Sequence, residues 1–369
     1  MAPTNLAIHL AQRPSGEIIP GTTFNHKTTP APTAADLKDG QILVEVLYLS
    51  LDPALRPQLD GKNFSPFHSF HEININAKCK DRRSYVPPVQ IGEVMRGVSA
   101  SRVIASTSKL ASPGDFVFAT TGWTQYKILS DGQFEPASQF PGLQEPQDML
   151  SALGLTSITA WIGMTQIGDP KPGELVVVSG AAGATGSVAG QIAKIKGARV
   201  VGLCGSDDKC AWLRDTLGFD VALNYKAADF KEQFKEATKD YIDVYFDNVG
   251  GETLDMCLGR AKPHARFVEC GVISQYNDAN PKGLRNIGQV VTMRIRMQGF
   301  IIFDHRDQFV EARTELSKWI AEGKLKKSET VLKGGLKAAE QGLIDLYKGI
   351  NTGKLLVEIK NPNETPSKL

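Results

Sequence analysis

The sequence predicts an α/β fold in which a doubly wound parallel sheet is combined with a second, mostly β domain. The 369-residue chain is longer than one hydrophobic core usually accommodates, so two domains are expected. Up to residue 148, short alternating runs are separated by turns, which is typical of β structure. From Met149 onward, helical periodicity alternates with short apolar strands, which is typical of a parallel sheet covered by helices.

The first part of the chain is expected to form a small sheet. Its apolar and polar residues alternate with the period of a strand that is buried on one face. The predicted strands are residues 42–49, 98–105, 115–119 and 125–129.

A glycine-rich turn opens the second part. Residues 175–178 are continuously apolar, as in a strand buried on both faces. Gly180, Gly183 and Gly186 follow, and they allow a tight turn that brings the backbone close to a pyrophosphate. The strand before this turn and the helix after it favour a dinucleotide-binding unit over an ordinary tight turn.

The remaining elements continue the alternation. Val188, Ile192 and Ile195 recur at helical spacing, and Gly197 suits a left-handed helix cap. Further strands are predicted at residues 200–203, 243–246, 266–270 and 295–302, with a helix at 306–322. A last apolar run at 355–359 is expected to rejoin the first domain, so the nucleotide domain is inserted into the β domain.

Composition excludes several classes of protein. The 42 Lys+Arg residues nearly balance the 40 Asp+Glu residues, which gives no electrostatic reason for binding nucleic acid or an anionic membrane. No apolar stretch could span a bilayer and residues 1–16 lack a signal-peptide core, so a soluble intracellular protein is expected. The five cysteines are scattered without a Cys-x-x-Cys pair, which argues against a disulfide framework and a structural zinc site.

Eight motifs in order resemble the zinc-free prostaglandin reductase and alkenal double-bond reductase branch of the medium-chain dehydrogenase/reductases. The motifs are Leu-Asp-Pro-Ala-Leu-Arg at 51–56, Ser-Tyr-Val-Pro-Pro at 84–88, Gly-Trp-Thr-Gln-Tyr at 122–126, the glycine turn, Gly-Ser-Asp-Asp-Lys at 205–209, Phe-Asp-Asn-Val-Gly-Gly at 246–251, Cys-Gly-Val-Ile-Ser-Gln-Tyr-Asn at 270–277 and Asn-Thr-Gly-Lys at 351–354. The resemblance implies a GroES-like catalytic domain at 1–148 and 326–369 and a Rossmann NADP-binding domain at 149–325. It also implies NADPH-dependent reduction of an activated carbon–carbon double bond, and a homodimer.

The resemblance extends to the lack of a metal site. Zinc-bearing relatives carry a histidine before the glutamate in the stretch matching Ile91-Gly92-Glu93, and they also have a four-cysteine lobe. This chain has neither. His68 and His71 form the only ligand-like pair, but they lie in an irregular aromatic segment with no cysteine partner except the distant Cys79, so a polar loop is the favoured interpretation.

The residues after the second nucleotide-domain strand favour NADP(H) over NAD. A basic residue at this place suits a 2′-phosphate, whereas an acid suits the ribose diol. Lys209 is the nearest cation, and the resemblance implies that Lys209 and Tyr225, assisted by Ser206, contact that phosphate. Asp207 and Asp208 argue against this assignment, and the alternative for Lys209 is a solvated surface charge.

The resemblance also implies the other cofactor contacts. They comprise the glycine turn, the ends of the later strands and the returning tail, and packing in a strand or turn is the alternative for each. The residues are Gly183, Ala184, Thr185, Gly186, Asn248, Cys270, Gly271, Val272, Ile273, Ser274, Gln275, Tyr276, Phe300, Ile301, Ile302 and Asn351.

Tyr276 is the candidate catalytic residue. Hydride transfer to the β-carbon of an enal or enone places negative charge on the carbonyl oxygen, which needs a hydrogen-bond donor, and the α-carbon needs a proton. Tyr276 could supply either. The alternative is an ordinary turn tyrosine, because a phenol with a pKa near 10 is only modestly suited to proton donation at neutral pH.

Two features depart from the family pattern. Ala54 stands where relatives usually carry an active-site tyrosine, and residues 61–83 look longer than the corresponding loop. The added segment contains Phe64, Phe67 and Phe70 and is either an aromatic lid or a surface insertion. The substrate pocket is therefore expected to be remodelled.

Three functions remain open. The first is the double-bond reductase, and the second is a carbonyl or quinone reductase using the same hydride chemistry. The third is a catalytically diverged NADPH-binding protein, which Ala54 makes credible.

Ser367-Lys368-Leu369 matches the peroxisomal signal read by an import receptor. Peroxisomal import is expected if residues 360–366 form a flexible tail, with a cytoplasmic enzyme as the alternative.

Overall fold

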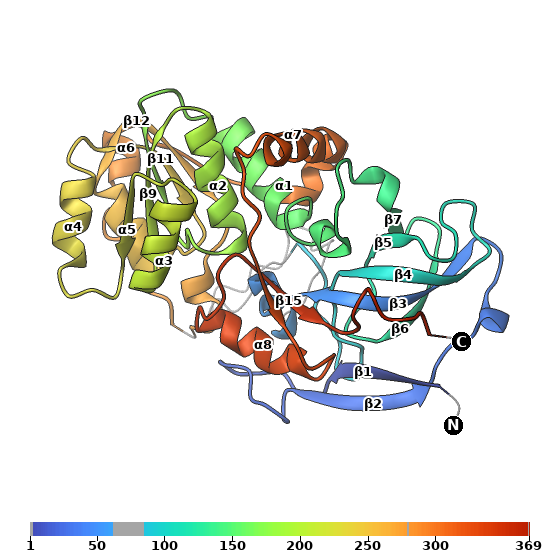
Figure 1. Cartoon of the computed structure of the whole chain (residues 1–369). Coiled ribbons are helices and arrows are strands. Elements are labelled where there is room, and N and C mark those ends of the chain that lie inside the picture. The colour runs from blue at the N-terminus through green and yellow to red at the C-terminus, as the bar shows by residue number, and fades with distance from the viewer. Residues whose placement is uncertain (1–2, 62–84, 279, 368) are drawn as a thin grey trace, which may run out of the picture.

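The structure is a computed structural model that describes residues 3–61, 85–278, 280–367 and 369 (Figure 1). The aromatic segment with Phe64, Phe67, Phe70, His68 and His71 lies outside the described residues, as do Cys79, Ser84 and Lys368. Figure 1 shows a parallel sheet with its helices on one side of the molecule and an antiparallel-rich sheet on the other. Among the described residues, no helix is both long and apolar enough to cross a membrane.

The β-rich part contains a seven-stranded sheet and a separate two-stranded ribbon. The sheet has the order β14-β15-β3-β4-β5-β7, and β6 also pairs with β3. The elements are β1 (Thr4–Leu10) and β2 (Phe24–Pro30) in the ribbon, and β3 (Gln41–Ser50), β4 (Ser99–Ser106), β5 (Phe116–Ala119), β6 (Tyr126–Ser130), β7 (Phe134–Pro136), β14 (Glu329–Leu332) and β15 (Lys354–Glu358) in the sheet.

The returning tail joins this sheet as predicted. Strand β15 lies antiparallel to β3, with Leu356 opposite Ser50 and Val357 opposite Leu49. All three leucine and valine side chains are buried, so the end of the chain contributes to the core of the first domain.

The second sheet is parallel and has the order β10-β9-β8-β11-β12-β13. Counted from β8, this is the 3-2-1-4-5-6 order of a doubly wound nucleotide-binding fold, whose ligand crevice lies where the order reverses, beside β8. The strands are β8 (Leu175–Val178), β9 (Arg199–Cys204), β10 (Val221–Asn224), β11 (Ile242–Asp247), β12 (Ala261–Glu269) and β13 (Arg296–Gly299).

Helices cover both faces of this parallel sheet. Val176 and Val178 of β8 pack in a core with α1, α2 and α7, whereas Leu175 and Val177 pack in another core with α4 and α5. This alternation explains the continuously apolar sequence of β8, because both faces of the strand are buried. The helices are α1 (Leu155–Ile162), α2 (Ala184–Ile195), α3 (Asp207–Ala211), α4 (Phe230–Ala237), α5 (Gly251–Leu258), α6 (Gln289–Thr292), α7 (Phe309–Ala321) and α8 (Ala338–Tyr347).

Three predicted boundaries were wrong. Strand β12 begins at Ala261 rather than at residue 266, and β13 ends at Gly299 rather than at residue 302. Helix α7 begins at Phe309 rather than at residue 306, because a 3₁₀ segment runs from Ile302 to Gln308. The prediction of a flexible tail was also wrong. The side chain of Arg102 donates to the carbonyl oxygens of Pro362 and Glu364, and these bonds hold the tail against β4.

Candidate active site

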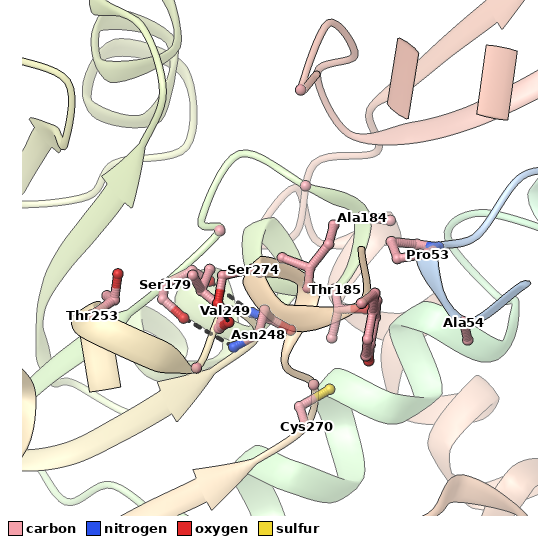
Figure 2. A pocket seen from close by; sticks show the side chains of 18 of the residues that line it. Pro53, Ala54, Ser179, Ala184, Thr185, Asn248, Val249, Thr253, Cys270 and Ser274 are labelled. Atoms are coloured by element: carbon pink, nitrogen blue, oxygen red, sulfur yellow. Dashed lines mark hydrogen bonds between the residues drawn. The ribbon is translucent and has the colours of Figure 1, made fainter. Parts of the chain in front are cut away.

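A cavity of about 1690 Å³ runs between the two sheets. One end is lined by the glycine turn and the carboxyl ends of β8, β9 and β11, and the other by residues 50–55 at the end of β3 and just after it. Figure 2 shows Ala184 and Thr185 of the turn between Asn248 on one side and Pro53 and Ala54 on the other. Ligands of open parallel sheets bind at this edge, so this cavity is the candidate site.

The glycine turn is shaped to leave room for a phosphate. Gly180 has φ +57°, which favours glycine, and a Cβ added to Gly186 would lie 2.4 Å from the carbonyl oxygen of Gly180. Helix α2 follows Gly183 with no side-chain cap. The N–H groups of its first turn therefore lack intrahelical partners. The positive end of the helix dipole lies at this same end of the cavity. These features fit a dinucleotide pyrophosphate.

Asp247 organises the turn after β11. It is fully buried, and its Oδ1 accepts hydrogen bonds from Ser179 (2.8 Å), from Tyr245 (2.7 Å) and from the N–H groups of Val249 (2.8 Å) and Gly250 (2.9 Å). The side-chain amide of Asn248 donates to the carbonyl oxygen of Ser179 over 2.7 Å (Figure 2). Ser179 thus holds Asn248 at the cavity wall, and Asp247 holds Ser179; sequence reasoning missed both.

The predicted 2′-phosphate residues are only partly brought together. Lys209 and Tyr225 line the cavity, whereas the hydroxyl of Ser206 accepts a hydrogen bond from the N–H of Lys209 and caps α3. Lys226 also lines the cavity, with its ammonium group 5.7 Å from the centre of the Tyr225 ring. Sequence reasoning missed Lys226, although it directly follows Tyr225.

The charge of Lys209 is directed toward the cavity. Its ammonium group donates to the carbonyl oxygen of Gly349, and burial lowers its pKa. Asp207, which argued against an anion site, is exposed and accepts a hydrogen bond from Asn224 over 2.9 Å. Neither Asp207 nor Asp208 lines the cavity.

The loop after β12 brings Tyr276 to the same cavity. Tyr276 ends a short 3₁₀ turn at Ile273–Gln275, and its hydroxyl oxygen accepts a 3.4 Å hydrogen bond from the N–H of Val272. Burial raises the pKa of Tyr276, so the phenol is neutral at physiological pH. Burial also raises the pKa of Cys270, at the start of this loop, to about 12, which makes its thiol a poor nucleophile.

Most of the predicted cofactor residues line this one cavity, and Ser206 and Val272 are the exceptions. The predicted residues that do line it are Gly183, Ala184, Thr185, Gly186, Lys209, Tyr225, Asn248, Cys270, Gly271, Ile273, Ser274, Gln275, Tyr276, Phe300, Ile301, Ile302 and Asn351.

The opposite end of the cavity has three phenol or guanidinium side chains that sequence reasoning did not identify. They are Tyr85, Arg96 and Tyr347. Arg96 donates to the carbonyl oxygens of Pro87 and Pro88 and so supports the segment that carries Tyr85. Burial raises the pKa of Tyr85, and the nearby Tyr276 contributes.

The fold and the cavity define a two-domain nucleotide-dependent oxidoreductase, and comparisons with known proteins agree. Residues 184–318 match the family described as zinc-binding dehydrogenase, and residues 75–137 match the N-terminal domain of oxidoreductase. The chain is 37% identical to a putative NADP-dependent oxidoreductase of Bacillus subtilis over 98% of this chain and 100% of the relative. It is 37% identical to the NADPH-dependent curcumin reductase of Escherichia coli, over 95% of each chain.

Further relatives narrow the family. Prostaglandin reductase 1 of Bos taurus is 36% identical over 91% of this chain and 93% of its own. The crystal structure of CurA from Vibrio vulnificus in complex with NADPH superposes with a TM-score of 0.84 at 36% identity, over 97% of this chain and 100% of that one. The chain therefore belongs to the zinc-free prostaglandin and alkenal reductase branch of the medium-chain dehydrogenase/reductases. In the described part of the chain, no group of three or more His, Cys, Asp or Glu side chains could hold a metal ion.

Proposed function

We propose that this NADP(H)-binding oxidoreductase reduces the carbon–carbon double bond of an α,β-unsaturated carbonyl compound. The observation that carries the proposal is the position of Tyr276, a neutral phenol in the same cavity as the glycine turn. Relatives named as curcumin, prostaglandin and 2-alkenal reductases support the same chemistry.

The proposal assigns a hydrogen-bonding role to Tyr276. Its oxygen accepts the Val272 N–H, which leaves the phenolic proton available to the carbonyl oxygen of a substrate. Bound NADPH would supply the hydride for the β-carbon, and the α-carbon of the resulting enolate would take its proton from water. Since burial raises the pKa of Tyr276, the phenol is better suited to stabilising the developing enolate oxygen than to releasing its proton at neutral pH.

The other residues hold the cofactor. The first turn of α2 would bind the pyrophosphate, while Lys209, with Tyr225 and Lys226, would bind the 2′-phosphate. Asn248 and Asn351 would contact the cofactor from the two sides of the cavity. The same proposal places the nucleotide-binding domain at residues 149–325.

A cofactor-oxidation screen tests the proposed function. The purified protein is given NADPH with a panel of enals, enones, quinones and enoyl thioesters, and the products are identified. We expect a saturated product with its carbonyl intact, and deuterium from 4-deuterated NADPH on the β-carbon. An allylic alcohol or a hydroquinone as the main product would instead identify a carbonyl or quinone reductase, and no NADPH oxidation across the panel would indicate a non-catalytic binding protein.

We also propose a homodimer formed through the edge of the parallel sheet. Strand β13 has β12 on one side and no partner strand on the other among the described residues, and Ile287 and Val291 near it are exposed. Such an edge suits antiparallel pairing with a second copy. Light scattering coupled to gel filtration measures the mass, and a monomer across the micromolar range would contradict this assignment.

Peroxisomal import through Ser367-Lys368-Leu369 is a further proposal, with a cytoplasmic enzyme as the alternative. An import receptor requires an accessible triplet. Ser367 instead donates to Glu45, and its hydroxyl also contacts Tyr126 (2.9 Å) and Lys360 (3.0 Å), so the tail must detach to be recognised. An N-terminal fluorescent fusion of this chain, compared with the same fusion lacking residues 367–369, tests import, and diffuse fluorescence from the former would contradict it.

A further inference from the structure

Tyr347 lines the end of the cavity that also contains residues 50–55, called here the substrate end. It is the last residue of α8, and its hydroxyl donates to the carbonyl oxygen of Pro53. Pro53 directly precedes Ala54, and all three residues line the cavity. The hydroxyl of Tyr347 is therefore tied to the backbone of the residue next to Ala54.

Tyr347 lines the same cavity as the candidate catalytic phenol. Burial raises the pKa of Tyr347, and the next largest contribution comes from Tyr276. Tyr276 lies on the loop after β12, whereas Tyr347 reaches the cavity from α8, so the two phenols approach the substrate end from separate elements.

The 3₁₀ turn that carries Ala54 is itself well anchored. It spans Pro53–Leu55, and the side-chain amide of Gln58 donates to the carbonyl oxygen of Ala54 over 3.0 Å. Asp52, which precedes the turn, forms an ion pair with the buried Lys354 of β15. The turn is therefore fixed, and a larger side chain at position 54 would take up space in the cavity that Tyr347 also lines.

We infer, on the basis of the proposed function, that Tyr347 determines substrate specificity. Its ring provides the aromatic surface at the substrate end that the small side chain of Ala54 cannot provide. Since its proton is donated to Pro53, the hydroxyl of Tyr347 offers only a lone pair to a ligand. The substrate class that fits is an enone with a flat aromatic substituent that carries a hydrogen-bond donor, such as a phenol.

A substitution cycle tests this inference with the single variants A54Y and Y347L and the double variant A54Y/Y347L. We expect A54Y to lower kcat/KM for an aryl enone by about tenfold or more, mainly through KM, because two rings compete for one space. The double variant should recover to within about threefold of the parent, because it moves the phenol rather than adding one. The affinity for NADPH, measured by fluorescence, should not change in any variant.

The hydroxyl is tested separately by Y347F, which keeps the ring. We expect its KM to rise for a hydroxyphenyl enone and to stay within about twofold for the phenyl analogue. For the Y347L variant, Tyr241→Leu is the matched control, because Tyr241 is exposed and does not line the cavity.

Thermal unfolding tests the coupling between positions 54 and 347 without relying on enzyme activity. A54Y should lower Tm more when Tyr347 is present than when Y347L is also introduced. The reason is that Y347L removes the ring with which the tyrosine at position 54 would compete for space. If A54Y does not fold, Ala54→Leu takes its place in the cycle. Additive effects on both kcat/KM and Tm would overturn the inference. If the parent reduces no enone, the proposed function fails, and the Tm coupling still decides whether Tyr347 fills the space beside Ala54.

Discussion

The backbone N–H of Gly353 donates to the carbonyl oxygen of Ala182 over 2.8 Å. Gly353 precedes β15 of the β-rich sheet, and Ala182 lies in the glycine turn of the parallel sheet. The bond therefore joins the two parts of the molecule at the turn where the pyrophosphate is proposed to bind. Nearby, the ammonium group of Lys209 donates to the carbonyl oxygen of Gly349 and provides a second link between the same parts.

Replacing Gly353 tests this link. Gly353 has φ +68°, and a Cβ there would lie 2.3 Å from the carbonyl oxygen of Ser328. Gly323 also has φ +68° but has open space around it, so Gly323→Ala isolates the backbone strain. We expect Gly323→Ala to cost about 1 kcal/mol of unfolding free energy in urea, and Gly353→Ala about 1–3 kcal/mol more, with weaker NADPH binding. Equal losses of unfolding free energy in the two variants would contradict the importance of the position that Gly353 holds between Ser328 and Ala182.

Lys209 should discriminate between the two cofactors. A charge-assisted contact is worth about 1.5–3 kcal/mol, so Lys209→Ala should weaken NADPH use by about ten- to a hundredfold and leave NADH use nearly unchanged. Steady-state kinetics with each cofactor measures the effect. Lys239→Ala is the control, because Lys239 is paired with Glu236 on the surface. A similar loss with NADH and NADPH would remove Lys209 from the 2′-phosphate site.

Tyr276→Phe removes the proposed donor and keeps the ring. We expect turnover to fall by about 10²–10⁴-fold, while NADPH affinity is retained, because the lost hydrogen bond forms only as charge develops on the substrate oxygen. Since the pKa of Tyr276 is raised above 10, the parent should not lose activity through this group between pH 7 and 9. Turnover within about twofold of the parent would exclude Tyr276 from the mechanism.

Glu269 should make stability depend on pH. Burial raises its pKa from the usual 4.5 to about 8, and its Oε1 has no hydrogen-bond partner. The folded state therefore holds a proton that the unfolded state releases between pH 4.5 and 8. The stability that this proton provides is complete below pH 4.5 and is lost as pH rises to 8.

The variant Glu269→Gln should remove this dependence. The difference in unfolding free energy, parent minus variant, should fall by on the order of 1–2 kcal/mol between pH 5 and 8. Urea titrations at several pH values measure it, and Glu311→Gln, at an exposed position of α7, is the control. A difference that stays constant or rises with pH would contradict this assignment.

Local patterns predicted those parts of the site that are contiguous in sequence. Strand β8, the glycine turn and α2 form one continuous segment, so the apolar run and the glycine spacing were sufficient to place them. Gly197 has φ +85°, which agrees with its predicted left-handed cap. The resemblance pointed to Lys209 and Tyr276, and both line the cavity.

Residues that act through distant contacts were not predicted. Asp247 acquires its role because Ser179 ends the neighbouring strand, and Tyr347 because α8 packs beside residues that follow β3. The spacing of apolar residues along the chain does not indicate which distant segments come together in the fold. The tail was expected to be flexible because it is polar and contains proline, but Arg102 and Glu45 on neighbouring strands provide partners for it.

The position of β15 beside β3 has a consequence for the order in which the protein folds as it leaves the ribosome. All strands of the parallel sheet lie in the middle of the chain, so they are synthesised before β15 emerges, and domains generally fold as units during synthesis. Strand β3 pairs with β4 and β6 early, but its end at Tyr48–Ser50 must wait for almost the entire chain before β15 arrives. The nascent protein thus carries an unpaired end of β3 for most of its synthesis, which is the interval in which chaperones or premature aggregation compete for it.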